Sequence, residues 1–501
     1  MNLRSLVRCA VLFLPLAASA HVNSPDVYFD GNAGPYHLLV TVRPPAVIPG
    51  IAQIEIRSAS PDVEQVEVVP QRMTGPGANL APTADPAERS ATDPQMFHGK
   101  LWIMGRGSWK VSVRVNGKKG AGELGVPLPA ISVNSVKMQM AMGGLLAFLG
   151  IALVAGMVGI AGAATREAKL DPGEEPSPVQ KKRSFRTMGG ATVFLIVVLI
   201  LANWWWGLDA SANARLNYKI PHAETSLHAG NVLQVRLDNP NTLENALSPW
   251  MYERVKRLNL PIGDSLGVVQ LNDLIPDHGH IMHLFLVSMP DMKSFWHLHP
   301  DASTEGQFAD KLPSLPAGHY QIYADIVHAN GFPETQISAI DLPAIAGEPL
   351  RGDDSGAADL AASDRVSQLS GGYRMVWEDS QPRIKTNQAM WFRFRVVDKD
   401  GKPAQLEDYM GMAGHAAFIS TDGQVFAHVH PAGSVSMAAV NLAEGAGQQT
   451  TMANMPGMNP PANGEVSFPY GLPQPGDYRI FVQVKRAGQV ETGEFAVRAE
   501  N

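Results

Sequence analysis

The segment from His415 to Pro431 reads HAAFISTDGQVFAHVHP, and the rest of the chain is interpreted outward from it. Strand-forming residues flank Asp422-Gly423, a pair favoured in the two-residue type I′ turns of β-hairpins. Such a turn places His415 directly opposite His430. Because side chains two apart on a strand share a face, His428 lies diagonally on the same face. The segment therefore predicts a hairpin with three imidazoles on one side.

A second segment follows the same plan. It consists of His283-Leu-Phe-Leu-Val, a loop, and Phe295-Trp-His-Leu-His-Pro300. In both segments the motif F-x-H-x-H-P is followed by L-P-x-(x)-G-x-Y-x-I, which begins at Leu315 in the first and at Leu472 in the second. Repetition of this order predicts two copies of one unit, in residues 207–345 and 367–501, joined by a polar linker at 346–366.

Imidazole is a common nitrogen ligand, and three on one rigid face suit Cu(II) or Zn(II). In the first copy His328 ends a strand that could approach the site, and His278 and His280 lie just upstream. The alternative is that these rings pack, bond to backbone and hold the hairpins together. The predicted imidazole ligands are His283, His297, His299, His328, His415, His428 and His430.

A second set of possible ligands lies between the last hairpin and its glycine motif. Met452, Met455 and Met458 recur every third residue. Pro456 and Gly457 exclude a helix core as the reason for that spacing. Thioether is a soft ligand that selects Cu(I), so the run favours copper. The alternative is a flexible loop that happens to contain methionine.

The N-terminus has the features of a secretory signal over residues 1–20, with Arg4 and Arg8 before an apolar run and Ala-Ser-Ala at its end. Cleavage there makes His21 the first residue, whose amine and ring could chelate Cu(II) with His37 or His98. The alternative is an ordinary terminus. Cys9 is the only cysteine, so the mature chain would have neither a disulfide nor a thiolate ligand.

Two apolar segments, 138–164 and 188–206, are long enough to span a membrane. Residues 165–187 between them are rich in Lys and Arg, which places that loop in the cytoplasm by the positive-inside rule. Residues 21–133 and 207–501 would then both lie outside, as the signal also indicates. The predicted location is a bacterial inner membrane, with the N- and C-terminal domains in the periplasm.

Outside the two spans the sequence predicts all-β domains of the β-sandwich kind, Ig-like or cupredoxin-like. Stretches such as Tyr36–Arg43 and Trp109–Val115 largely alternate apolar and polar residues. The 47 Gly and 38 Pro suit many turns. A net charge of −7 argues against nucleic acid as a partner.

The twin hairpins resemble a module of bacterial membrane-anchored secreted proteins that often accompanies heavy-metal handling. Gly279-His-Ile-Met-His283 and Ala324-Asp-Ile-Val-His328 belong to that resemblance. Residues 21–133, with Gly34-Pro-Tyr36 and Gly107-Ser-Trp109, look like the YtkA/FixH type of Ig-like domain. The resemblance implies an Ig-like fold and a link to heavy-metal handling.

We therefore expect a membrane-anchored periplasmic metal-binding protein that binds, buffers or transfers copper, with zinc as the alternative metal. Its partners would be the membrane and another metal-handling protein. Two other functions stay open: an Ig-like interaction scaffold without metal, and an enzyme with a three-histidine metal. No nucleophilic triad or nucleotide motif has convincing spacing, so the prediction is binding rather than turnover and names no catalytic residue.

Overall fold

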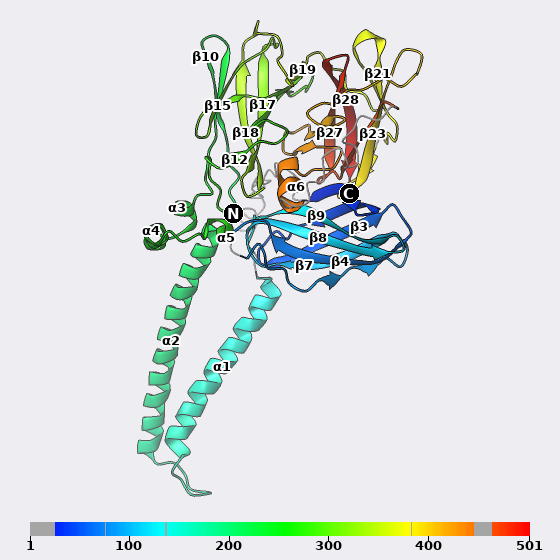
Figure 1. Cartoon of the computed structure of the whole chain (residues 1–501). Coiled ribbons are helices and arrows are strands. Elements are labelled where there is room, and N and C mark those ends of the chain that lie inside the picture. Colours follow the sequence, from blue (N-terminus) through cyan, green and yellow to red (C-terminus); the bar gives the residue numbers. More distant parts are fainter. Residues whose placement is uncertain (1–25, 76, 136–137, 382, 445–462) are drawn as a thin grey trace, which may run out of the picture.

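The computed structural model describes all residues except 1–25, 76, 136–137, 382 and 445–462. It consists of three β-sandwich domains and a pair of long helices (Figure 1). We call the sandwiches domain I, domain II and domain III in chain order. The predicted fold class, β-sandwiches with two apolar helices, is confirmed.

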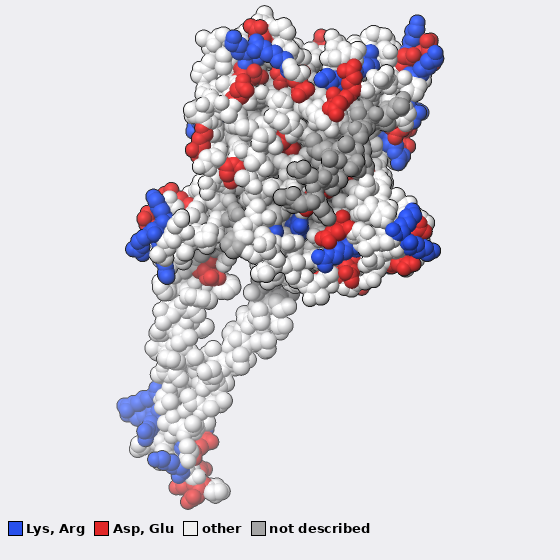
Figure 2. All heavy atoms as spheres, viewed as in Figure 1, with Lys and Arg blue, Asp and Glu red and all other residues white. Residues whose placement is uncertain are grey.

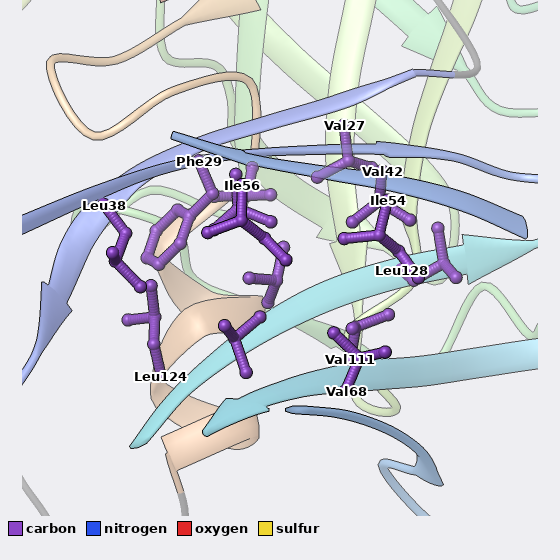
Figure 3. Packing of buried hydrophobic residues seen from close by; sticks show 14 of the residues in the cluster. Val27, Phe29, Leu38, Val42, Ile54, Ile56, Val68, Val111, Leu124 and Leu128 are labelled. Atoms are coloured by element: carbon purple, nitrogen blue, oxygen red, sulfur yellow. The ribbon is translucent and has the colours of Figure 1, made fainter. Parts of the chain in front are cut away.

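Domain I has two antiparallel sheets. The first contains β1 (Val27–Ala33), β2 (Tyr36–Arg43), β3 (Gly50–Ser58), β7 (Met96–Ile103) and β6 (Glu88–Arg89). The second contains β5 (Asp85–Pro86), β4 (Val63–Arg72), β8 (Gly107–Gly117) and β9 (Gly120–Ala130). Alternation along these strands sends one set of side chains inward, and Figure 3 shows Phe29, Ile54, Val111 and Leu124 meeting between the sheets.

The helices are α1 (Met140–Glu167) and α2 (Pro178–Arg215), and both are long and apolar enough to cross a membrane. They exceed the predicted spans. Helix α2 begins at 178 because Ser177 and Gln180 form a capping box, so four of the basic residues predicted in a loop, Lys181, Lys182, Arg183 and Arg186, lie on α2. Ser184 Oγ donates to Gly162 O at 2.7 Å and joins the two helices.

Domain II is built in the same way from two sheets. The first contains β10 (Glu224–His228), β11 (Val232–Arg236), β16 (Gln307–Lys311) and β15 (Asp301–Thr304). The second contains β12 (Leu274–Ile275), β17 (Gly318–His328), β13 (Met282–Met289), β14 (Phe295–Leu298) and β19 (Ser355–Ala357), with β18 (Pro333–Leu342) also on β17. Three short helices, α3 (Leu243–Ala246), α4 (Pro249–Leu258) and α5 (Gly263–Leu266), lie close to the end of α2.

Domain III contains one sheet of β20 (Val366–Gln368), β21 (Arg374–Trp377), β23 (Met390–Val397) and β26 (Glu465–Tyr470). Its other sheet contains β22 (Arg383–Lys385), β28 (Gln489–Glu500), β27 (Gly476–Arg486), β24 (His415–Ser420) and β25 (Phe426–Val429). The predicted linker 346–366 is partly sheet, because β19 within it pairs with β14 of domain II.

The two sheets that carry the histidine hairpins pack against each other through their outer faces. In β13, Leu284 and Leu286 enter the core of domain II, whereas Phe285 and Val287 face domain III. Both faces of the strand are thus buried, which explains why its sequence is almost continuously apolar.

Two aromatic stacks join these sheets and are reciprocal. Phe295 of β14 stacks on Phe481 of β27 at 4.3 Å between ring centroids. Tyr323 of β17 stacks on Phe426 of β25 at 4.3 Å. Phe295 and Phe426 hold the same place in the F-x-H-x-H-P motif, and Tyr323 and Phe481 hold the same place after the glycine motif. The interface therefore repeats itself with the domains exchanged.

Domain I holds the loop that follows the second hairpin. Asp30 N donates to Ala432 O at 2.8 Å, and Ser434 N donates to Tyr28 O at 2.9 Å. Gly433 lies between them with φ 126°, and a Cβ there would come within 2.0 Å of Tyr28 O. The next element, α6 (Met437–Glu444), packs on β9. The segment after His430 is therefore fixed by two domains.

Candidate metal centre

The register of both hairpins agrees with the prediction. In the second, Ala417 pairs with His428, and the same register continued by two residues sets His415 opposite His430. In the first, Phe285 pairs with His297, which sets His283 opposite His299 in the same way. All these rings share the face that is turned toward the other domain.

The turn of the second hairpin differs from the predicted two-residue type. Strand pairing ends at Ile419 and Phe426, and Gly423 N donates to Ser420 O at 2.8 Å. The hydroxyl of Ser420 accepts from Val425 N at 2.8 Å and donates to Asp422. Ser420 N still donates to Val425 O at 3.0 Å, so the loop covers residues 421–424 instead of two residues, and the register is kept.

Six of the rings form two groups whose nitrogen atoms lie within 4.8 Å of one another. The first group, which we call the domain II trio, contains His283, His297 and His299. The second group, which we call the interdomain trio, contains His278, His415 and His430. The structure thus brings together the three histidines predicted for the first hairpin.

The second trio differs from the predicted set by one member. His428 was expected with His415 and His430, but His278 of domain II completes that group. His428 lies beside it, 4.4 Å from His430 between ring centroids. His428 instead turns its Nδ1 toward Asp325 of domain II, while His278 approaches His415 and His430 from the facing domain.

In the domain II trio each ring is oriented by a hydrogen bond behind it. Nε2 of His283 donates to Asp277 O at 3.1 Å. Nδ1 of His297 donates to Gln483 Oε1 at 2.9 Å, and Nδ1 of His299 donates to Asp354 at 2.9 Å. Such outer partners fix the tautomer of metal-ligating histidines. Each neutral ring therefore presents an unprotonated nitrogen to the centre.

Two of these nitrogens are in contact. His283 Nδ1 and His297 Nε2 lie 3.0 Å apart, which is hydrogen-bond distance when one of the two rings carries a proton there. A cation bound by both nitrogens would take the place of that proton. Imidazole binds Zn²⁺ at about 2.0–2.1 Å, which allows two nitrogens at this separation to share one ion.

The interdomain trio is supported by an unusual turn. His278 has φ 50°, a left-handed conformation uncommon outside glycine, within a turn closed by bonds between Asp277 and His280. The turn places the ring centroid of His278 4.8 Å from that of His430 and 5.3 Å from that of His415. His430 Nδ1 donates to Val435 O at 3.0 Å. Among the described residues, both nitrogens of His415 lack hydrogen-bond partners.

Burial keeps these rings neutral. Desolvation lowers the pKa of His278 and of His430 to about 4. Desolvation, reinforced by neighbouring imidazoles, holds the pKa of His283, His297 and His415 well below the usual range. Neutral imidazole is the form that binds metal, so no proton need leave at pH 7.

Reciprocal contacts across the domain boundary orient the central rings. Gln483 of β27 holds His297 of domain II, and Asp325 of β17 holds His428 of domain III, with 3.2 Å between Asp325 Oδ2 and His428 Nδ1. Asp325 and Gln483 are both seventh after the glycine that begins their strand, Gly318 or Gly476. Neither domain alone completes the surroundings of its own histidines.

His328 lies apart from both trios, contrary to the prediction that it could approach the site. Its Nδ1 is 2.7 Å from Asp273 Oδ1 and its Nε2 is 4.0 Å from Glu334. Burial lowers the pKa of His328, but these two carboxylates outweigh burial and raise the pKa to about 9. We interpret it as a cation that ties β17 to its neighbours.

Other predicted ligands cannot be placed at the centre. Met452, Met455, Met458 and His21 lie outside the described residues. The rings proposed to join His21 are apart from each other: His37 contacts Asp30, and His98 lies on β7 opposite Glu55.

Sequence reasoning missed His278 as a trio member, and it missed Asp354 and Gln483 as orienting residues. A signal for His278 existed, since five histidines lie between 278 and 299. Asp354 lies in the segment predicted as linker, and Gln483 lies in a strand of the other domain. Neither has a sequence feature that points to the site.

His328 leads to a prediction about pH. A folded-state pKa raised to about 9 contributes stability that is complete below the unfolded value of 6.5 and is lost as pH rises through 9. Between pH 6 and pH 10, we expect the free energy of unfolding of the wild type to fall by on the order of 3 kcal/mol more than that of His328→Gln. Denaturant unfolding at the two pH values measures this. Parallel pH profiles would contradict the assigned charge.

Comparison with known proteins finds a family model for one domain and structures of low similarity. A family model described as "Domain of unknown function (DUF8832)" matches residues 367–501, which form domain III. No curated protein matches the chain. A tetra-tandem repeat from the extending region of a large adhesion protein has 9% identity and a TM-score of 0.15, covering 90% of this chain and 71% of that one.

An ICAM-5 D1–D4 ectodomain fragment has 7% identity and a TM-score of 0.15, covering 92% of this chain and 77% of that one. At these TM-scores the likenesses carry no argument about function.

Proposed function

We propose that this protein is a membrane-anchored, extracytoplasmic metal-binding protein that holds late first-row transition ions between domains II and III. Copper is the proposed metal, and zinc is the alternative. The observation that carries the proposal is the pair of buried histidine trios, each with ring nitrogens within 4.8 Å of one another. Nε2 of His299, Nε2 of His430 and both nitrogens of His415 have no hydrogen-bond partner among the described residues. Neutral imidazole suits both metals.

The helix pair supports a location at a membrane. Its middle section exposes apolar residues, and charges gather at the end far from the domains (Figure 2). Lys181, Lys182 and Arg183 lie at that end, and Trp204 to Trp206 lie nearer the domains. Positive-inside placement puts the three domains outside, in the periplasm if the membrane is a bacterial inner membrane.

Burial favours binding over catalysis. The side chain of His278 is 0% exposed and that of His299 is 4% exposed. A catalytic metal needs an open position that substrate can reach. Rings enclosed by two domains suit storage or transfer of an ion better than turnover of a substrate.

The matching registers and reciprocal contacts also support a common origin of domains II and III. In both, the hairpin adjoins the long strand that follows the glycine motif. We propose that the two arose by duplication, and that their mutual packing turned two histidine faces toward one space.

The experiment is metal analysis of the full chain purified in detergent and dialysed against trace Cu and Zn. We expect wild type to retain metal and a six-residue variant to retain none. That variant replaces with alanine His278, His283, His297, His299, His415 and His430. The matched control replaces three histidines outside the cluster, His222, His228 and His319, and should bind as wild type does. Wild type without Cu or Zn would overturn the proposal.

A further inference from the structure

The two trios lie side by side. Ring centroids of His278 and His283 are 6.1 Å apart, and those of His297 and His415 are 6.1 Å apart. Each of these pairs joins a member of one trio to a member of the other. Adding about 3.2 Å from each ring centre to its ion, which is about 2.1 Å for the nitrogen–ion bond and about 1.1 Å from the nitrogen to the ring centre, two bound ions would be no more than about 13 Å apart.

One further ring occupies the space between the trios. His428 lies 5.3 Å from His283 and 5.6 Å from His297, between ring centroids. It also lies 4.4 Å from His430. Its Nδ1 faces Asp325, and its buried Nε2 has no partner among the described residues. A seventh free nitrogen thus lies beside both groups.

Carboxylates surround the cluster without basic partners. Asp277 is 5% exposed, and its side chain accepts from Ala438 N at 2.8 Å while lying 3.8 Å from His278. Asp325 contacts His428 from the other side. In the part of the chain that the structure describes, neither forms an ion pair with Lys or Arg. Two carboxyl groups thus lie beside the cluster, where their negative charge would offset that of a bound cation.

We propose that the two trios form one dinuclear metal centre, shared by domains II and III, with His428 between the ions as a seventh ligand whose free Nε2 binds one of them. This inference rests on the proposed function and specifies its site. Seven neutral imidazoles leave two divalent ions with four positive charges, which Asp277, Asp325 and Asp354 partly offset. The centre would be complete only when the two domains are docked.

Electron paramagnetic resonance of the full chain loaded with two Cu(II) per molecule tests the proposal. Two Cu(II) ions this close should give spectra broadened by dipolar coupling. Two variants should bind less copper and give sharp spectra: one lacks His283, His297 and His299, and the other lacks His278, His415 and His430. Wild type loaded with mostly Zn(II) and little Cu(II) is the matched uncoupled control.

His428→Ala provides a second readout by equilibrium titration. We expect the first equivalent of metal to bind as in wild type and the second to bind about tenfold or more weakly. Anomalous diffraction from crystals soaked in zinc should show two peaks within about 13 Å of each other.

The results that would overturn metal binding differ from those that would overturn only the dinuclear centre. Wild type without metal would overturn the proposed function and the dinuclear centre together. Two coppers with uncoupled spectra, or zinc peaks farther apart, would overturn the dinuclear centre and leave metal binding intact.

Discussion

Metal saturation is expected to raise the free energy of unfolding by about 4 kcal/mol when the free ion exceeds its Kd about 1,000-fold, because the ion binds the folded state. The structure gives a reason why the ion should bind the folded state in preference to the unfolded state. Buried nitrogens of His299, His415 and His430 lack partners among the described residues, and a bound ion would satisfy them. Thermal and denaturant unfolding with and without chelator measure the difference.

His415→Leu provides a control with two opposite expectations. His415 is 1% exposed, and neither ring nitrogen has a partner among the described residues. Replacing an unsatisfied buried polar group with an apolar one should raise the stability of the metal-free protein by about 1 kcal/mol or more. The same change should remove much of the stabilisation by metal. A metal-free His415→Leu that is less stable than wild type would show that the ring serves packing alone.

Phe295→Ala is expected to destabilise the protein by about 3–5 kcal/mol and to weaken metal binding as well. Phe295 is fully buried and stacks on Phe481 across the domain boundary at 4.3 Å. Its loss leaves a cavity in the layer that positions the two hairpins. The interdomain trio, which needs both domains, should lose more affinity than the domain II trio.

Phe308→Ala is the matched control, since Phe308 is equally buried but packs inside domain II. It should cost similar stability with little effect on the interdomain trio. A double-mutant cycle of Phe295 and Phe481 should give about 0.5–1.5 kcal/mol of coupling. Equal losses of metal affinity in both alanine variants would contradict a role for the interface.

Local pattern was enough for part of the candidate site. The F-x-H-x-H-P motif and the turn before it set the hairpin register, since a one-residue slip would turn every histidine to the other face. His283, His297 and His299 could therefore be grouped from sequence. The turn length at Ser420 was predicted wrongly, because its hydroxyl competes with the backbone for hydrogen bonds.

The predicted roles of His328 and His428 depended on what lies across from them. His328 ends the expected strand, but Asp273 and Glu334 surround it there. His428 faces the expected side, yet His278 from the other domain takes its place in the trio. Partners more than a hundred residues away, such as Asp325 for His428, leave no periodic signal in a single sequence.

By itself, the sequence determined the β-sandwich class, the two apolar helices and the histidine face of each hairpin. Those features follow from side-chain alternation, segment length and turn chemistry, which act over a few residues. Only the tertiary structure decided that the two faces meet, that His278 crosses the boundary and that Asp354 and Gln483 orient the rings. The physical reason is that these contacts arise from the docking of whole sheets through Phe295, Tyr323, Phe426 and Phe481.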